Sequence, residues 1–318
     1  MKDLHLLPKV RDSLSYLYLE HCRIEQDKKA IAVHDAEGVT HVPCASLTAL
    51  MLGPGTSITH AAIRTLADSG CLVLWSGEGA VRFYAQGMGE TRSARRLLRQ
   101  AQIWAGPSSK LRVVFRLYQM RFGEDLDPSL TLRQVRGKEG IRVRESYARA
   151  SRETGVPWEG RDYKRTDWSQ ADPVNRALSA ANSCLYGVCQ AAIVSAGYSP
   201  ALGFIHTGKM LSFVYDIADL YKTELTIPIA FKAALDGSSG LESRVRRFCR
   251  DAFNEQRLLA RIVPDIEKAL DVPSEDDSDW IVDADAALPG RLWDPDGAVE
   301  GGVSYEMGLG NGHDSDNA

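Results

Sequence analysis

Residues 206–222, HTGKMLSFVYDIADLYK, carry one histidine and two aspartates in a stretch that is otherwise largely apolar. At helical spacing from Leu211, the apolar side chains form one stripe, while Asp216 and Asp219 stand three residues apart on another face. His206 precedes this predicted helix, beyond a TGK turn that could bring its imidazole back toward the carboxylates. Carboxylates and an imidazole are ligands that Mg²⁺ or Mn²⁺ accepts. The spacing therefore raises the hypothesis of a metal site.

Both features also have a plainer interpretation, which this segment alone leaves open. Two carboxylates at i and i+3 are common on the solvated side of an amphipathic helix. A single histidine after a strand-like LGFIH segment is often a hydrogen-bonded structural residue. A metal site needs support from elsewhere in the chain.

A further carboxylate, Glu139, lies between two glycines in the arginine-rich segment LRQVRGKEGIRVRESYA. An acid in such a basic setting suits a site that handles phosphate. The alternative is that Glu139 only pairs with Arg136 or Arg142 on the surface of a helix, and spacing alone does not separate the two.

Length and composition indicate a globular protein of 318 residues, for which two domains with separate cores are expected. The N-terminus lacks the charged-then-apolar pattern of a signal peptide, and we expect no apolar run to reach the length of a membrane span. We therefore expect a cytoplasmic protein without membrane contact. The six cysteines include no CxxC pair, so reduced, mostly buried thiols fit best and structural zinc is not expected.

The net charge of -4 combines two opposite parts. Residues 271–318 hold 13 acidic residues and one arginine, whereas the rest of the chain has a net charge of +8. Arginines of this basic body gather in groups near positions 92–99, 133–149 and 244–250. Such groups suit contacts with nucleic-acid phosphates. Each group alone is more typical of a solvated helix surface, but three groups in one body favour phosphate contacts.

The hydrophobic pattern predicts an α+β protein. Alternating apolar segments indicate strands at the start, and a helix is expected to begin after an N-cap at Thr59 and to stop at Gly70. The period then becomes helical. We expect a β-rich domain at 1–89, a mainly α-helical domain at 90–270 and a flexible acidic tail at 271–318. The GPGTSITHAAIR turn lacks both G-x-G-x-x-G and the Walker lysine, so no nucleotide cofactor is assigned.

Several long motifs together resemble a known family. The motifs that carry the resemblance occur along the chain in the order LGPGTSITHAAIR, GEGAVRFYA, RGKEG, NSCLYG and GFIHTGKMLSFVYDIADLYK, which is the order of the family. The chain resembles CRISPR-associated protein one, the integrase subunit of spacer acquisition, and is most similar to its subtype I-E form. The resemblance extends to about Leu270 and leaves out the acidic tail. It implies an N-terminal β domain joined to a helical domain.

The same resemblance implies a metal site and a set of DNA contacts. Glu139, His206 and Asp219 would hold Mg²⁺ or Mn²⁺, with Asp216 as the neighbouring acid of the site. The family is homodimeric, and two dimers flank a dimer of the small CRISPR-associated protein two, with a DNA duplex across the assembly. Candidate DNA contacts are His21, at a position where some relatives have a tyrosine that stacks on the duplex end, together with the basic residues Arg64, Arg82, Lys209, Lys222, Arg246 and Arg250.

The expected reaction is strand transfer, in which the 3′-hydroxyl of a captured DNA fragment attacks a phosphodiester at the edge of a CRISPR repeat. The first alternative is a metal-dependent nuclease of branched DNA that uses the same residues with water as nucleophile. A second is a DNA-binding scaffold whose carboxylates are structural. A metal-dependent hydrolase of small molecules would leave the arginine groups unused.

Overall fold

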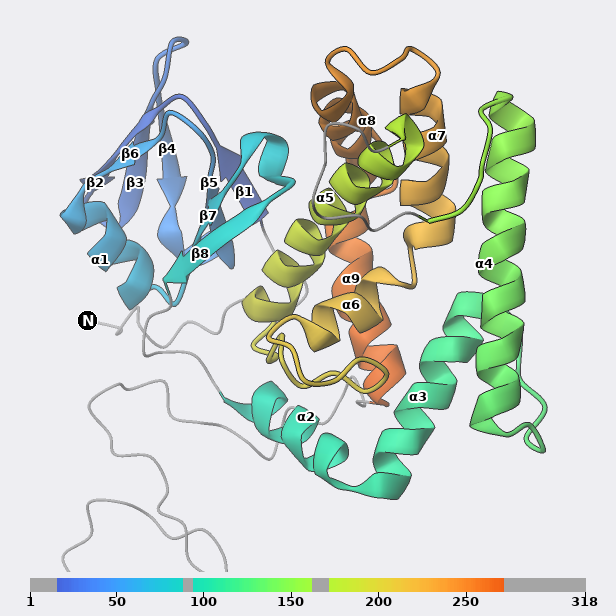
Figure 1. Ribbon diagram of the computed structural model, residues 1–318. Helices are drawn as coiled ribbons and strands as arrows, with labels where there is room; N and C mark the ends of the chain where they lie inside the picture. The colour runs from blue at the N-terminus through green and yellow to red at the C-terminus, as the bar shows by residue number, and fades with distance from the viewer. Residues whose placement is uncertain (1–15, 88–93, 162–171, 272–318) are drawn as a thin grey trace, which may run out of the picture.

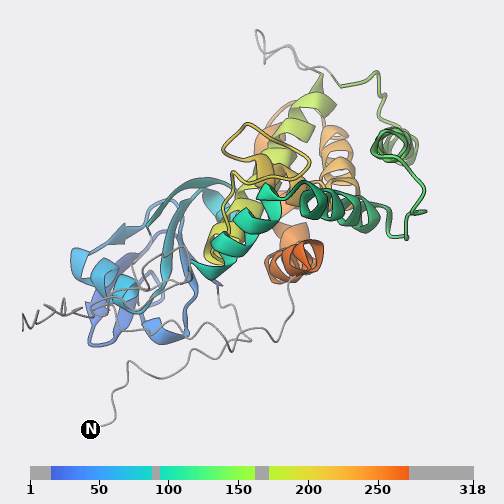
Figure 2. The same cartoon turned by 90° about the horizontal axis from the view of Figure 1, so that it is seen from below.

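The computed structural model describes residues 16–87, 94–161 and 172–271, which form a β-rich part followed by a helical part (Figure 1). A view turned by 90° shows the same separation of strands and helices (Figure 2). The predicted α+β class, with strands first and helices after, is confirmed. The exact domain limits stay a prediction, and the acidic tail from residue 272 onward lies outside the described residues.

Two four-stranded sheets make up the described β-rich part. The first has the order β1-β5-β7-β8, in which β1, β5 and β7 run parallel and β8 pairs antiparallel with β7. The second has the order β4-β3-β2-β6. The elements are β1 Tyr16–Leu19, β2 Arg23–Asp27, β3 Ala30–His34, β4 Val39–Pro43, β5 Ala49–Leu52, β6 Ser57–Ile58, α1 His60–Asp68, β7 Leu72–Ser76 and β8 Phe83–Gly87.

Strand β5 is buried on both of its faces, as expected for a parallel strand inside a sheet. Because side chains alternate along a strand, Leu50 and Leu52 join a core with the second sheet and α1, while Ala49 and Met51 face the opposite way. The predicted start of α1 is confirmed, since the Thr59 side chain accepts a hydrogen bond from the backbone N–H of Ala62.

The described helical part follows the helical period of the sequence. In the helical stretch that begins at Leu241, Arg257 has a positive φ, so the chain forms two helices and Leu258 starts the second one. The helices are α2 Arg95–Ala105, α3 Pro107–Phe122, α4 Leu132–Thr154, α5 Pro173–Ser195, α6 Ser212–Ala218, α7 Ile227–Ala234, α8 Leu241–Glu255 and α9 Leu258–Leu270, with a π-helical turn at Lys222–Thr226.

Helix α5 is the central helix, and 16 of its 23 residues are buried. It is the one helix of the described part that is long and apolar enough to cross a membrane, which was not expected from the sequence. Of its most apolar window, 72% is buried inside the protein. Packing in the core thus accounts for its apolar character.

The two parts of the fold touch closely where α5 passes β8. Gly187 of α5 leaves no room for a side chain, because a Cβ there would lie 2.8 Å from the Cα of Arg82 and 3.0 Å from the backbone nitrogen of Phe83. Further along α5, Ala191 and Val194 pack on Met51 and Leu74 of the first sheet. The helix therefore links the sheet to the helical core.

Candidate active site

Asp219 stands at the C-terminal end of α6, and its side chain is only 17% exposed. Its two oxygens have different partners: Lys222 Nζ lies 2.6 Å from Oδ1, and an Arg121 guanidinium nitrogen lies 3.1 Å from Oδ2. Burial acts to raise the pKa of Asp219, but the positive charges of Lys222 and Arg121 outweigh it and the pKa is lowered. Asp219 is thus a buried carboxylate kept ionised by two cations.

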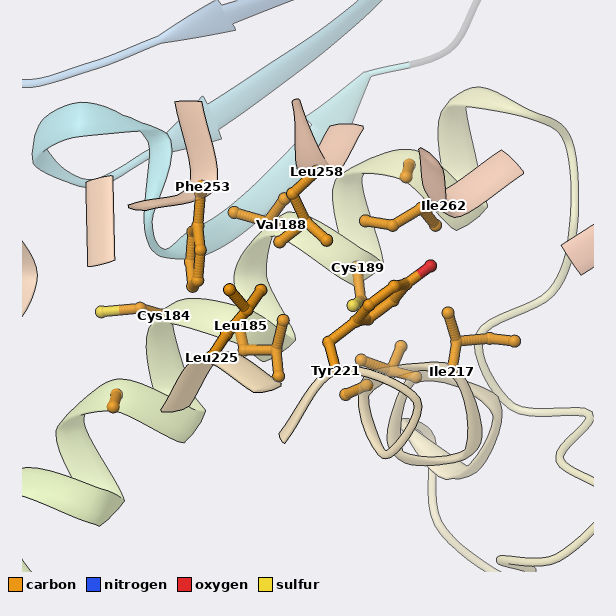
Figure 3. Packing of buried hydrophobic residues seen from close by; sticks show 14 of the residues in the cluster. Cys184, Leu185, Val188, Cys189, Ile217, Tyr221, Leu225, Phe253, Leu258 and Ile262 are labelled. Carbon is orange, nitrogen blue, oxygen red and sulfur yellow. The ribbon is translucent and has the colours of Figure 1, made fainter. Parts of the chain in front are cut away.

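Tyr221 anchors the segment after α6 that carries Asp219 and Lys222, because its side chain is inserted between α5 and α9 (Figure 3). Its ring packs with Ile217, Cys189 and Ile262 in the helical core. Its hydroxyl donates a hydrogen bond of 2.6 Å to Asp265 of α9. Asp219 and Lys222 are therefore held on either side of a fixed aromatic residue.

Glu139 lies on α4, which begins with a capping box between Thr131 and Gln134. Arg142, one turn further on, places its Nε 2.9 Å from Glu139 Oε2, which is the helix-surface pair considered as an alternative from the sequence. The Glu139 side chain is only 16% exposed, and its Oε1 lies 3.7 Å from a guanidinium nitrogen of Arg121. The Glu139 carboxylate therefore contacts both Arg142 on its own helix and Arg121, which also pairs with Asp219.

Arg121 joins the two carboxylates and was missed by the sequence analysis. Its side chain is 3% exposed and bridges Glu139 of α4 and Asp219 beyond α6. The signal was its position: on α3, residues 113, 114, 117, 118 and 121 follow the helical spacing of a buried stripe, and all five are buried. An arginine on such a stripe predicts buried acidic partners.

Asp216 is completely buried, which corrects its expected position on a separate, polar face of the helix. Its carboxylate accepts hydrogen bonds from the backbone N–H groups of Phe204, Ile205 and His206 at 2.5, 3.1 and 2.9 Å. These donors explain the burial, because a buried carboxylate is tolerated only where its lone pairs are satisfied. Asp216 thus fixes the loop that carries His206.

His206 receives its orientation from the same carboxylate. Its Nδ1 lies 2.7 Å from Asp216 Oδ1, so Nδ1–H donates to the carboxylate and Nε2 is the ring nitrogen that faces Asp219. Nε2 lies 4.0 Å from Asp219 Oδ2. These contacts join seven side chains, called the cluster below: Glu139, Asp216, Asp219, His206, Arg121, Arg142 and Lys222. His206, whose side chain is 42% exposed, lies at the solvent side of the cluster. The turn proposed from the sequence does bring the imidazole back toward both aspartates.

The loop before His206 is held from the outside by helix α2. The buried side chain of Gln100 donates to the carbonyl oxygens of Ser199 and Leu202 and accepts from the Ser199 N–H. Trp104 Nε1 donates to the carbonyl oxygen of Gly203 at 2.9 Å. Both residues were missed. Gln100 could have been noticed as a polar residue three positions before the buried Ile103.

A cavity of about 370 Å³ opens beside the cluster, between β8 and α5. Tyr186, in its wall, connects it to the cluster, because Lys222 Nζ lies 4.9 Å from the centre of this ring. Burial raises the pKa of Tyr186, against the effect of Lys222. The lining includes Arg82, Tyr84, Ser183, Tyr186, Gln190 and Leu211. Two candidate DNA contacts, Arg82 and Lys222, thus stand near one opening.

The remaining candidate DNA contacts occupy three other places. Arg246 and Arg250 of α8 line a second cavity of about 200 Å³ together with Arg247, Ser243, Glu78 and Gly79. Lys209 is exposed on the loop after His206. His21 and Arg64 are exposed on the β-rich part, at the β1–β2 connection and on α1. The structure thus brings together the carboxylate, histidine and Lys222 group, with the other cations distributed around it.

The donor set fits a hard divalent cation, although the carboxylates are engaged in ion pairs. Glu139 Oε1 and Asp219 Oδ2 both approach the one guanidinium of Arg121, and His206 Nε2 faces the same Asp219 oxygen. Two carboxylate oxygens and an imidazole nitrogen around a common cation suit Mg²⁺ or Mn²⁺. Within the described ranges, no three His, Cys, Asp or Glu side chains form a ready-made metal cluster, and Arg121 lies between the two carboxylates. The ligand assignment stays a prediction.

Comparison with known proteins gives a consistent result. A family model described as CRISPR associated protein Cas1 matches residues 119–238, which include the whole cluster. A protein from Thermus thermophilus, described as CRISPR-associated endonuclease Cas1 2, is 58% identical over 307 residues, with 96% of this chain and 94% of that protein covered. A CRISPR-associated endonuclease Cas1 from Escherichia coli is 42% identical over 262 residues, with 82% of this chain and 86% of that protein covered.

The solved structures agree with these relatives. A crystal structure of a TtCas1–DNA complex is 58% identical, with a TM-score of 0.78, and covers 84% of this chain and 100% of that chain. A casposase bound to integration product has a TM-score of 0.54 at 14% identity over 81% of this chain and 96% of that chain, and this likeness shows a shared fold alone. With 58% identity across nearly the full length of both proteins, the chain belongs to the Cas1 family of CRISPR-associated proteins.

Proposed function

We propose that this protein is a metal-dependent DNA integrase and endonuclease of CRISPR adaptation, of the subtype I-E kind. It would insert short DNA fragments into a CRISPR array by attack of a 3′-hydroxyl on a phosphodiester at the edge of a repeat. The observation that carries the proposal is that the carboxylates of Glu139 and Asp219 both lie next to the guanidinium of Arg121, with His206 Nε2 4.0 Å from Asp219 Oδ2.

In this proposal, Glu139, His206 and Asp219 hold Mg²⁺ or Mn²⁺. When bound, the ion supplies Lewis-acid polarisation of the phosphodiester and charge stabilisation. Asp216 is a positioning residue, because it holds His206 through Nδ1 and keeps Nε2 directed to the cluster. Lys209 and Lys222 bind phosphate oxygens at the solvent side, and Arg82, Arg246, Arg250, Arg64 and His21 contact the duplex.

The partners belong to the proposal as well. They are a double-stranded DNA fragment with free 3′ ends, CRISPR repeat DNA and a small dimeric CRISPR-associated protein two, with two homodimers of this chain around it. The relative crystallised as a complex with DNA supports the DNA part. The basic body of this chain, with a net charge of +8 outside residues 271–318, suits the same ligand.

Hydrolysis is the second candidate reaction, since relatives are described as endonucleases. The same residues can serve water attack, so the nucleophile separates the two reactions. The test combines the protein, its small partner and Mn²⁺ with a short 3′-hydroxyl duplex and a supercoiled plasmid that carries a CRISPR repeat.

His206→Ala runs beside His41→Ala, a control in which the lost imidazole pairs with Asp27 on the surface of the β-rich part. Joined fragment at the repeat edges, lost in His206→Ala and retained in His41→Ala, supports integration. Cleavage without joining, with the partner bound, favours the nuclease. Equal joining by wild type and His206→Ala contradicts the assigned site.

A further inference from the structure

We infer that Arg121 is an internal counter-ion of the candidate metal site and makes binding of a divalent cation depend on simultaneous binding of a DNA phosphate. The inference rests on the proposed function, because it takes Glu139, His206 and Asp219 as the metal ligands. It assigns to Arg121 a positioning and coupling role in metal loading.

The guanidinium of Arg121 stands where the two carboxylates meet. One terminal nitrogen lies 3.7 Å from Glu139 Oε1, and the other lies 3.1 Å from Asp219 Oδ2. The second nitrogen also lies 3.4 Å from the backbone oxygen of Asp216. Arg121 therefore ties α4 to the end of α6.

Arg121 cannot leave this position easily. Its side chain is 3% exposed, and its guanidinium packs 5.2 Å from the centre of the Tyr118 ring on its own helix. Among the described residues, its buried Nε has no hydrogen-bond partner, which is a cost that the surrounding ion pairs must offset. A fixed positive charge is thus built into the position at which the carboxylates would receive the ion.

The cluster is already balanced in charge without a metal ion. Asp216, Asp219 and Glu139 supply three negative charges, and Arg121, Arg142 and Lys222 supply three positive charges. A divalent cation alone would leave two uncompensated positive charges in a largely buried site, where charges interact far more strongly than in water.

A phosphodiester removes this obstacle because it adds negative charge from the open side. His206 is 42% exposed, and the exposed Lys209 follows three residues later, so this side is accessible to a DNA backbone. The ion and the phosphate therefore bind cooperatively, and each increases the affinity for the other by the same factor.

The test measures Mn²⁺ binding directly, through the loss of the electron paramagnetic resonance signal of free Mn²⁺. Full-length wild type, Arg121→Met and Arg116→Met are titrated with and without a short duplex, and duplex alone is titrated as a blank. Arg116→Met is the matched control, since Arg116 lies on the same helix and pairs with Asp271 outside the cluster.

For wild type and Arg116→Met, we expect the duplex to tighten Mn²⁺ binding by about tenfold. For Arg121→Met, the free protein is expected to bind Mn²⁺ about tenfold more tightly than wild type, and the duplex then changes the affinity by less than about threefold. Equal or weaker Mn²⁺ binding by folded Arg121→Met overturns the inference, as does an undiminished effect of the duplex in this variant.

Two further variants keep the outcomes separate. If Arg121→Met loses its native circular dichroism spectrum, Arg142→Met is used in its place. Arg142 is 23% exposed and pairs with Glu139, so Arg142→Met removes one positive charge from the cluster at a more exposed side chain. We expect Arg142→Met to bind Mn²⁺ about threefold more tightly than wild type. Glu139→Gln tests the metal site itself. If Glu139→Gln binds Mn²⁺ as tightly as wild type, the proposed function is contradicted. If Glu139→Gln loses Mn²⁺ binding while both arginine variants bind as wild type does, only the coupling is contradicted.

Discussion

Asp216 Oδ1 accepts hydrogen bonds from both the backbone N–H and the ring Nδ1 of His206, at 2.9 and 2.7 Å. One buried carboxylate therefore fixes the backbone and the ring of the histidine together. Since the other Asp216 oxygen accepts from Phe204 and Ile205, the loop cannot shift without loss of these bonds.

Asp216→Asn is expected to lower the free energy of unfolding by about 3 kcal/mol, because an amide group brings its own N–H donors to a site surrounded by N–H donors. Urea denaturation measures the change. Asp251→Asn is the control: this aspartate is exposed and forms a surface pair with Arg250, so a change within about 0.5 kcal/mol is expected. An Asp216→Asn midpoint equal to that of wild type contradicts the assignment.

Gln100→Met is expected to loosen the loop at 199–206 while it keeps a side chain of similar size. The substitution leaves the Ser199 N–H and the carbonyl oxygens of Ser199 and Leu202 without their partner, at a cost of about 2 kcal/mol. Hydrogen exchange at the amides of Phe204 and His206 should become faster. Gln102→Met, at an exposed position on the same helix, should leave these rates unchanged.

Stability should depend on pH through Asp219. Because its pKa in the folded protein is lowered, its contribution is fully present above the unfolded value of about 3.9 and is lost as pH falls through the lower, folded pKa. Lys222→Met removes a cation that lowers this pKa, so the Asp219 carboxyl should titrate at higher pH, as followed by carbon-13 NMR.

The destabilisation caused by Lys222→Met should accordingly be largest above about pH 5 and shrink as Asp219 takes up its proton. Lys232→Met on α7 is the control, since Lys232 lies over the Phe248 ring away from the carboxylates. A destabilisation by Lys222→Met that stays constant across the acid range would show that the pair does not set the titration of Asp219.

Gly187→Ala is expected to cost about 1–3 kcal/mol, because the new methyl group would meet the backbone of Arg82 and Phe83 and push β8 from α5. At Gly137 in α4, an added Cβ would lie more than 4 Å from every described side chain and from every element other than its own helix, so Gly137→Ala should instead stabilise by about 0.5–1 kcal/mol. Thermal unfolding compares the two. Equal effects of both substitutions would contradict the close contact at Gly187.

Deletion of residues 272–318 is expected to raise the affinity for duplex DNA at low salt, since this segment is acidic and the remaining body is basic. The difference should disappear as salt increases, because screening weakens both the attraction to DNA and the competition by the acidic residues. Fluorescence anisotropy with a labelled duplex measures it. Unchanged affinity at low salt would exclude a screening role.

The period of the sequence predicted most elements because burial repeats with the geometry of strands and helices. Thr59 and Gly70 marked the ends of α1 correctly, with Thr59 as a capping residue and Gly70 at a positive φ. The break at Arg257 was not predicted. A positive φ at an arginine depends on tertiary packing and has no local sequence signal.

The site was only partly readable from the sequence, because spacing reports which residues are neighbours but not which are buried. The hypothesis that His206 folds back toward the aspartates agrees with the structure. The burial of Asp216 depends on backbone N–H groups of a loop, and the bridge by Arg121 depends on how α3, α4 and α6 meet. Neither relationship is local in the chain.

The course of α5 has a consequence for folding cooperativity. The helix contributes Leu185 to the helical core and Ala191 and Val194 to the face of the sheet formed by Ala49, Met51, Leu72 and Leu74. Cutting the chain near residue 89 would expose that apolar face to water, so the β-rich part produced alone should associate or remain poorly folded. The intact chain should melt as one calorimetric unit, with equal van't Hoff and calorimetric enthalpies.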